Sequence, residues 1–323
     1  MRVQMDASRH DITVENACFK QKHIEKVLNE ISKNFESYFY DFLKSGGHLL
    51  SDEDYDIRIS TGYNDNSVSF DVKCNLIRII QTALQDYECE REYYINLMDK
   101  EVLAEYEYDD LTFKSKELKD RCPVIRRTLQ NRLAKSLDKF RAAFTASSSK
   151  DLLNCVMKLS EFERNYMNTI YNSASYDEIV YYKDLKLSDL DEKPEYTVRG
   201  VIGGGIKSHF LYKISPSAFP NRSRFAVWAL WYLTNKKDFG CEYGSEFIMT
   251  DLKKDIVQQN YFYPYELFAF YAQQIYLMLK IKAETTDVRL EEKYRYVYVD
   301  AFLSSVAQKH IYEISEFTRR VND

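Results

Sequence analysis

Glycine and proline are almost confined to one stretch of this chain. Six of the nine glycines and four of the five prolines lie between residues 194 and 264 of a sequence of 323. Because these two residues interrupt helices and strands more than others do, the remaining sequence can form long regular elements. The chain therefore divides into a long region suited to regular structure and a shorter, turn-rich block in its second half.

The apolar residues of the first half are spaced as on one face of a helix. From Asn16 to Ser45, and again from Leu76 toward Tyr106, they recur at steps of three and four. Two further runs of this kind follow Pro123 and the sequence "TASSSKD" at 145–151. No Glu-x-x-His pair, the usual metal motif of a helical bundle, occurs in this half. We expect residues 1–175 to form a helical region.

The pattern of residue types changes after Ser173. Aromatic and β-branched residues predict strands at 176–187 and 196–202, and alternating apolar residues between Asp56 and Val72 predict a hairpin. The sequence "EFIMTDLKK" from 246 predicts a buried strand. Helices are expected at 208–213, after an Asn221 N-cap, after Pro264 and at 298–321. The predicted fold is mainly α (α+β): an N-terminal helical bundle with a small mixed α/β element in the region 176–323.

Composition indicates an ordinary folded protein. Hydrophobic residues make up 45% of the chain and charged residues 29%, and no apolar run reaches the roughly 18 to 20 residues that span a bilayer. The six cysteines are scattered, without the paired spacing of a zinc site. We expect a cytoplasmic protein with reduced thiols and no membrane contact.

Charge is distributed unevenly along the chain. Residues 1–195 carry 28 basic and 36 acidic groups, residues 196–262 carry 9 and 5, and residues 263–323 carry 8 and 9. The basic surplus therefore coincides with the glycine-rich block. A functional surface is expected there, because binding residues concentrate on loops that a rigid scaffold holds.

The sequence "RGVIGGGIKSH" at 199–209 resembles a nucleotide-binding loop only in part. Gly200 and Gly205 have the P-loop spacing, but Ile206 comes before Lys207, so the lysine is turned away from the loop amides. A looser interpretation keeps an anion site. Gly203, Gly204 and Gly205 would present amides ahead of a short helix, with Lys207, Ser208 and His209 close by. The alternative is a glycine-rich turn that lets two elements pack closely.

The strand "SEFIMTD" and the lysines after it resemble metal-dependent nucleases of the PD-(D/E)xK type. In such enzymes two acids hold magnesium and a lysine orients the attacking water. Asp238 and Asp251 are the candidate Mg²⁺ ligands here, Lys253 is the candidate catalytic lysine, and Gln258 is the candidate polar helix residue. The alternative is a strand that ends in solvent-exposed charged residues without a catalytic role.

A cluster of basic residues in the same block suits a nucleic-acid backbone. Its cations are interleaved with aromatic residues that offer stacking surfaces: Lys207, Lys213, Arg222, Arg224, Lys236, Lys237, Lys253 and Lys254, with Phe219, Trp228, Trp231 and Tyr261. Arg222 and Arg224 precede a predicted helix, where phosphate is doubly favoured. The alternative has these cations paired with the acidic first half.

Two classes of function follow from these patterns. The leading hypothesis is a cytoplasmic phosphate-recognising protein that interacts with nucleic acid, in one version as a magnesium-dependent nuclease. The other is a non-catalytic helical scaffold whose partner is another protein or a second copy of the chain.

Overall fold

The computed structural model describes residues 17–50, 71–132, 134–241, 244–251 and 256–322. Helices dominate these residues, and the one sheet among them has two antiparallel strands, β1 (Ile248–Asp251) and β2 (Ile256–Gln259). Met249 lies opposite Gln258 in the register. The predicted fold class, mainly helical with a small mixed element in the second half, is confirmed.

Helix α15 (Arg295–Lys309) forms the centre of the larger helical cluster. Four helices pack around it: α2 (Gln21–Phe42), α3 (Val72–Glu88), α13 (Arg224–Leu233) and α14 (Tyr265–Thr285). Twelve of its fifteen residues are buried, as expected for a helix that is surrounded by other helices. Because α2 and α3 come from the first half, the predicted regions 1–175 and 176–323 share one apolar core.

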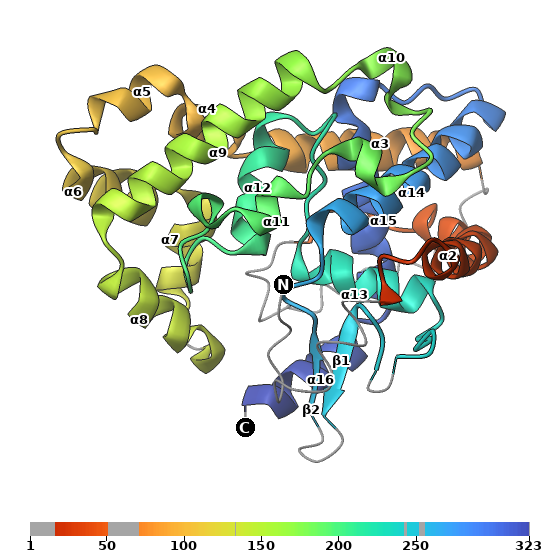
Figure 1. Ribbon diagram of the computed structural model, residues 1–323. Coiled ribbons are helices and arrows are strands. Elements are labelled where there is room, and N and C mark those ends of the chain that lie inside the picture. Colours follow the sequence, from red (N-terminus) through yellow and green to blue (C-terminus); the bar gives the residue numbers. More distant parts are fainter. Residues whose placement is uncertain (1–16, 51–70, 133, 242–243, 252–255, 323) are drawn as a thin grey trace.

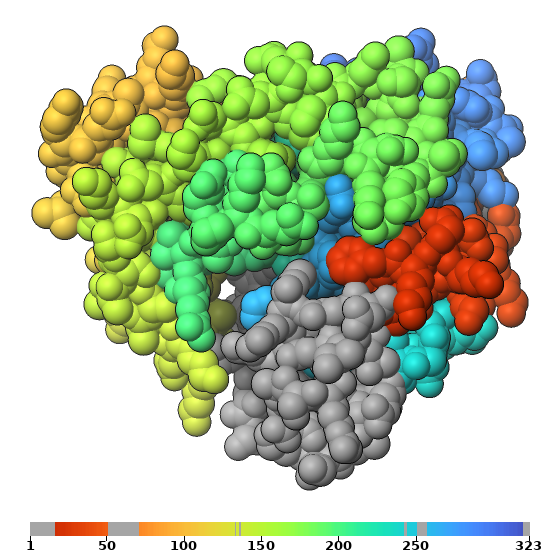
Figure 2. All heavy atoms as spheres, in the orientation of Figure 1, coloured from red at the N-terminus to blue at the C-terminus, as the bar shows by residue number. Residues whose placement is uncertain are grey.

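A second cluster surrounds the long helix α9 (Ser149–Thr169). Six elements pack against it: α4 (Arg91–Met98), α5 (Lys100–Glu105), α6 (Asp110–Thr112), the π-helix η1 (Phe113–Arg121), the short helix η4 (Pro194–Tyr196) and α12 (Gly204–Ile214). Helix α12 also contacts α4, so it connects the glycine-rich block to this cluster. Helices α7 (Pro123–Gln130) and α8 (Asp138–Ala146) lie below it, in the yellow-to-olive lobe at the side of Figures 1 and 2.

The remaining elements are shorter or terminal. They are α10 (Ser173–Tyr176), α11 (Asp189–Glu192), α16 (Ile311–Asn322), η2 (Lys135–Leu137), η3 (Tyr182–Leu185) and η5 (Glu292–Tyr294). No helix in the described ranges is both long enough and apolar enough to cross a membrane.

Several predicted elements are confirmed. The first helix, the helices after Pro123, after "TASSSKD" and after Pro264, and the strand within "EFIMTDLKK" all form near the expected positions. The glycine-rich loop is followed by a helix, α12, which extends beyond the predicted 208–213 at both ends. The predicted hairpin at 56–72 lies outside the described residues except for its end, where Val72 begins α3.

The strands predicted at 176–187 and 196–202 are wrong. These residues form α10, η3, η4 and turns, apart from a single bridge between Val198 and Ile202. Tyr182 and Leu185 are buried and anchor the connection to the core. The β-rich composition of this segment therefore reflects side chains that pack, since strand propensity largely measures packing on a half-buried surface.

Helix ends also differ from the predictions. Ser223, and not Asn221, caps α13, because its hydroxyl accepts a hydrogen bond from the Ala226 amide at 3.0 Å. The helix expected at 298–321 begins earlier and breaks at His310, which separates α15 from α16. The helix expected from Leu76 toward Tyr106 is three helices, and the first break contains Glu90 in a left-handed conformation (φ 63°).

Candidate functional site

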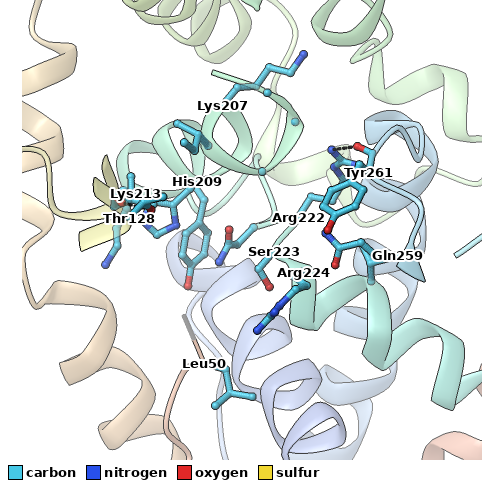
Figure 3. Close-up of a pocket in the computed structure, with 18 of the residues that line it drawn as sticks. Leu50, Thr128, Lys207, His209, Lys213, Arg222, Ser223, Arg224, Gln259 and Tyr261 are labelled. Carbon is cyan, nitrogen blue, oxygen red and sulfur yellow. Dashed lines mark hydrogen bonds between the residues drawn. The ribbon is translucent and has the colours of Figure 1, made fainter. Parts of the chain in front are cut away.

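A cavity of about 950 Å³ opens where the N-terminus of α12 meets the start of α13, the end of β2 and helix α7. Its lining comes from both helical clusters, and much of it comes from the glycine-rich block. Figure 3 shows the side chains of Arg222, Ser223 and Arg224 on one side of the cavity, with Gln259 and Tyr261 beside them. The block that the sequence singled out therefore does supply much of one enclosed surface.

Helix α12 begins at the three consecutive glycines. Gly203 is its N-cap residue, in extended conformation, and Gly204 and Gly205 form the first turn. The first amide to find a backbone acceptor is that of Lys207, which donates to the Gly203 carbonyl at 3.0 Å. The amides of Gly204, Gly205 and Ile206 donate to no other described residue. All three glycines line the cavity, so the positive end of the helix dipole lies at its wall.

The guanidinium group of Arg222 lies directly against this helix end. A methyl group added at Gly204 would lie 1.6 Å from Nη2 of Arg222 and 2.7 Å from its Cζ, so only glycine leaves room for the guanidinium. Nη1 donates to the Tyr263 carbonyl at 2.8 Å and Nη2 to the Tyr261 carbonyl at 3.0 Å. Arg222 is only 5% exposed, and these two hydrogen bonds fix its orientation. A fixed, permanently charged group therefore lies beside the helix N-terminus.

Lys207 is directed away from the centre of the cavity (Figure 3). Its Nζ donates to the Leu190 carbonyl and lies 3.6 Å from Oδ1 of Asp191. Burial lowers the pKa of Lys207, and the positive charge of Arg222 lowers it further, whereas Asp191 opposes the shift. Lys207 therefore anchors α12 to the segment before it.

Ser208 has a positioning role. Its hydroxyl donates to the Gly205 carbonyl at 2.8 Å and accepts the Arg222 amide at 3.2 Å. The side chain is buried beneath the cavity and is not part of its lining. Ser208 thus ties the first turn of α12 to the segment that carries Arg222.

His209 and Lys213 line the cavity farther along α12. Burial, together with the charge of Lys213, lowers the pKa of His209 to about 3, so the imidazole is neutral at pH 7. His209 shares a hydrogen bond of 3.2 Å with the Tyr94 hydroxyl. Burial lowers the pKa of Lys213 to about 8, and its Nζ donates to the Tyr87 carbonyl at 2.6 Å. His209 therefore offers no positive charge to an anion at pH 7.

Some aromatic residues of the glycine-rich block line the cavity, and others are buried in the core. Tyr261 is 57% exposed and Phe262 is 41% exposed, and both line the cavity. Phe219 and Trp228, which the sequence suggested as stacking partners for bases, are buried in the core, so that part of the prediction is wrong. The exposed aromatic rings at the cavity, which a planar ligand could stack on, are those of the turn after β2.

Several basic residues of the glycine-rich block form ion pairs. Nζ of Lys237 lies 2.6 Å from Oε2 of Glu30. Lys237 and Lys207 therefore both pair with acidic groups of residues 1–195, as the alternative interpretation expects. Lys236 pairs instead with Glu313 of α16 at 2.5 Å. Arg224 remains at the cavity wall, with its guanidinium 4.5 Å from the centre of the Phe225 ring.

The candidate magnesium site is described only in part. Asp238 is exposed after α13 and accepts the Gly240 amide at 2.9 Å. Asp251 ends β1, but its side chain and the whole of Lys253 lie outside the described residues. Gln258 lies on β2 and not on a helix, and its neighbour Gln259 lines the cavity instead. Within the described ranges, no three His, Cys, Asp or Glu side chains are grouped to hold a metal.

One wall of the cavity was missed by the sequence interpretation. Helix α7 contributes Arg127 and Thr128, and Arg127 lies 2.9 Å from Oε2 of Glu90, which also lines the cavity. The signal that could have found this wall is the local charge around α7, which the count over residues 1–195 concealed.

Comparison with family models, with curated proteins and with solved structures finds no match to this chain.

Proposed function

We propose that this chain binds nucleic acid, with a phosphate group held in the cavity at the N-terminus of α12. The observation that carries the proposal is the position of Arg222, whose guanidinium occupies the space that Gly204 leaves at the helix end. A phosphate there would accept hydrogen bonds from the first-turn amides and lie close to a fixed cation. Helix N-termini and arginine are both common phosphate-binding elements in proteins.

The size and lining of the cavity favour a ligand larger than a free phosphate ion. About 950 Å³ is at the upper end of the usual range for small-ligand sites. Arg222 donates to the main-chain carbonyl of Tyr261, so the phosphate-binding group and an exposed ring belong to adjoining positions. Stacking of a base on Tyr261 or Phe262 would complement phosphate binding, as in many single-strand binding sites.

A magnesium-dependent nuclease is the catalytic version of this proposal, and its support is the sequence pattern of Asp238, Asp251 and Lys253. It predicts cleavage of DNA or RNA that requires Mg²⁺ and disappears in Asp251→Ala and Lys253→Ala variants. A cytoplasmic location is part of the same proposal, supported by six free cysteines, which suit a reducing compartment.

The binding proposal is tested with Arg224→Gln, Arg222→Gln and a control, Arg289→Gln, whose side chain is exposed away from the cavity. Thymidine monophosphate and a fluorescent dT5 oligonucleotide are titrated into each protein. A charge-assisted hydrogen bond contributes about 2 kcal/mol, so each cavity variant should bind about 30-fold more weakly, with the control unchanged.

Thermal unfolding of each variant separates a lost contact from a lost fold. Equal affinity of Arg224→Gln and the control for both ligands would contradict the proposal. So would a wild-type protein that binds neither ligand but retains a protein partner, which would favour the scaffold hypothesis.

A further inference from the structure

Residues 114–141 form a strongly basic segment within an acidic chain. They contain ten Lys and Arg residues against three Asp and Glu residues, a net charge of +7, whereas the rest of the chain carries −12. In the structure they make up almost all of η1 together with α7, η2 and the start of α8. We call this part of the molecule the basic lobe.

Part of the positive charge in the basic lobe is neutralised by neighbouring carboxylates. Arg121 pairs with Glu117 at 2.8 Å, Arg141 pairs with Asp138 at 2.7 Å, and Arg127 pairs with Glu90. Four of the remaining cations are exposed side chains that form no ion pair or hydrogen bond with any other described residue: Lys119, Arg132, Lys135 and Lys139. Exposed cations that the fold does not use can exchange their counterions for a polyanion.

The basic lobe adjoins the cavity. Val124, Arg127 and Thr128 of α7 line it, as do Leu137 at the end of η2 and Phe140 of α8. The connection between α7 and α8, which carries Arg132 and Lys135, is therefore joined at both ends to elements that form the cavity wall. A nucleic-acid strand that left the cavity on this side would meet the basic lobe first.

We infer that the basic lobe is a second binding surface, which holds the sugar-phosphate backbone of a nucleic acid outside the cavity. The choice of nucleic acid among polyanions rests on the proposed function, because the cavity beside the lobe suits a nucleotide unit. None of the exposed large apolar side chains of the described chain lies within residues 114–141, so the lobe lacks the apolar anchors that insert into a membrane.

The test compares two sets of three lysines replaced by glutamine. The lobe variant is Lys119→Gln, Lys135→Gln and Lys139→Gln. The control is Lys20→Gln, Lys22→Gln and Lys26→Gln, which removes the same charge from exposed positions on and just before α2. Binding of fluorescent dT30 is measured by anisotropy over a series of salt concentrations. Because each phosphate contact contributes about 0.7 to the salt slope for a single strand, the lobe variant should lose about 2 from the slope. Its Kd near physiological salt should rise tenfold or more, while the control matches wild type.

Thymidine monophosphate separates this inference from the proposed function. The lobe variant should bind the mononucleotide as wild type does, because its three substitutions lie outside the cavity lining. If wild type binds dT30 through the lobe but does not bind the mononucleotide, the cavity proposal fails and the lobe inference stands. Equal salt slopes for the lobe variant and the control would overturn the inference. Tighter binding of wild type to phosphatidylserine vesicles or to polyglutamate than to dT30 would also overturn it.

Discussion

Replacement of Gly204 by alanine should displace the guanidinium of Arg222. The added methyl group would lie 1.6 Å from Nη2, whereas a comfortable contact between carbon and nitrogen needs about 3.5 Å, so the group must move by roughly 2 Å. Such a movement breaks the hydrogen bonds of 2.8 and 3.0 Å to the carbonyls of Tyr263 and Tyr261. Hydrogen bonds to a charged group contribute about 1.5 kcal/mol or more each, so the loss is about 3 kcal/mol.

Part of this loss is offset, because alanine favours a helix over glycine by up to about 1 kcal/mol. The expected net destabilisation is about 2 kcal/mol. For a chain of this length that free energy corresponds to a fall in Tm of about 3 °C, from an unfolding entropy of about 2 cal/mol/K per residue. Affinity for thymidine monophosphate should fall at least tenfold, because Arg222 no longer lies beside the helix end.

The neighbouring Gly203 provides the control. Its φ of −99° suits any residue, and an added methyl group would meet nothing within 4 Å. Gly203→Ala should therefore change the free energy of unfolding by less than about 1 kcal/mol and leave ligand affinity intact. If Gly204→Ala and Gly203→Ala unfold at the same temperature and bind the nucleotide equally, the proposed packing of Arg222 against Gly204 is refuted.

Three further predictions concern the fold. Ser223→Ala removes the cap of α13 and should lower the free energy of unfolding by about 1 kcal/mol in urea titrations. Tyr263→Phe removes the buried hydroxyl that donates to Oε1 of Glu246 at 2.7 Å; it should cost about 2 kcal/mol in the same assay, and no change would mean that water replaces the bond. The pKa of His209 is about 3 when folded and about 6.5 in an unfolded chain, so the unfolded state takes up the proton first. The free energy of unfolding should therefore decrease as the pH falls below about 6.5, and it should be about 1 kcal/mol lower at pH 5.5. His209→Gln should remove this contribution, whereas the control His48→Gln, at an exposed residue, should keep it.

The sequence predicts the helical elements well because their apolar spacing is a local property. The strand at Ile248–Asp251 and the helix after Pro264 are found for the same reason. Prediction fails at 176–202, where buried tyrosines and leucines look like strand residues but anchor turns. Whether such a segment forms a strand or a turn depends on residues far away in the sequence. Glu266 is one of them, because its carboxylate accepts a hydrogen bond from the Leu187 amide at 2.8 Å.

The glycine-rich block supplies much of the cavity lining, but its sequence does not predict the contacts within the cavity. The three glycines and Arg222 were recognised from composition, yet no local pattern places Arg222 against Gly204, 18 positions away. Lys207 looked like a phosphate ligand and instead bonds to the Leu190 carbonyl. The wall formed by α7 was missed because charge was summed over 195 residues, within which the ten cations of residues 114–141 are hidden by a larger number of acids.

The separation of charge between the basic lobe and the rest of the chain has a kinetic consequence. Residues 114–141 carry a net charge of +7 and the rest of the chain carries −12, so this segment attracts a polyanion while the net charge of the rest repels it. Encounters are then oriented before contact, which raises the productive association rate at low ionic strength and makes it fall steeply as salt is added. The dissociation rate depends instead on the short-range contacts formed after docking. Under the proposed function, salt would therefore determine how often a nucleic acid arrives in the correct orientation, and the cavity would determine how long it stays.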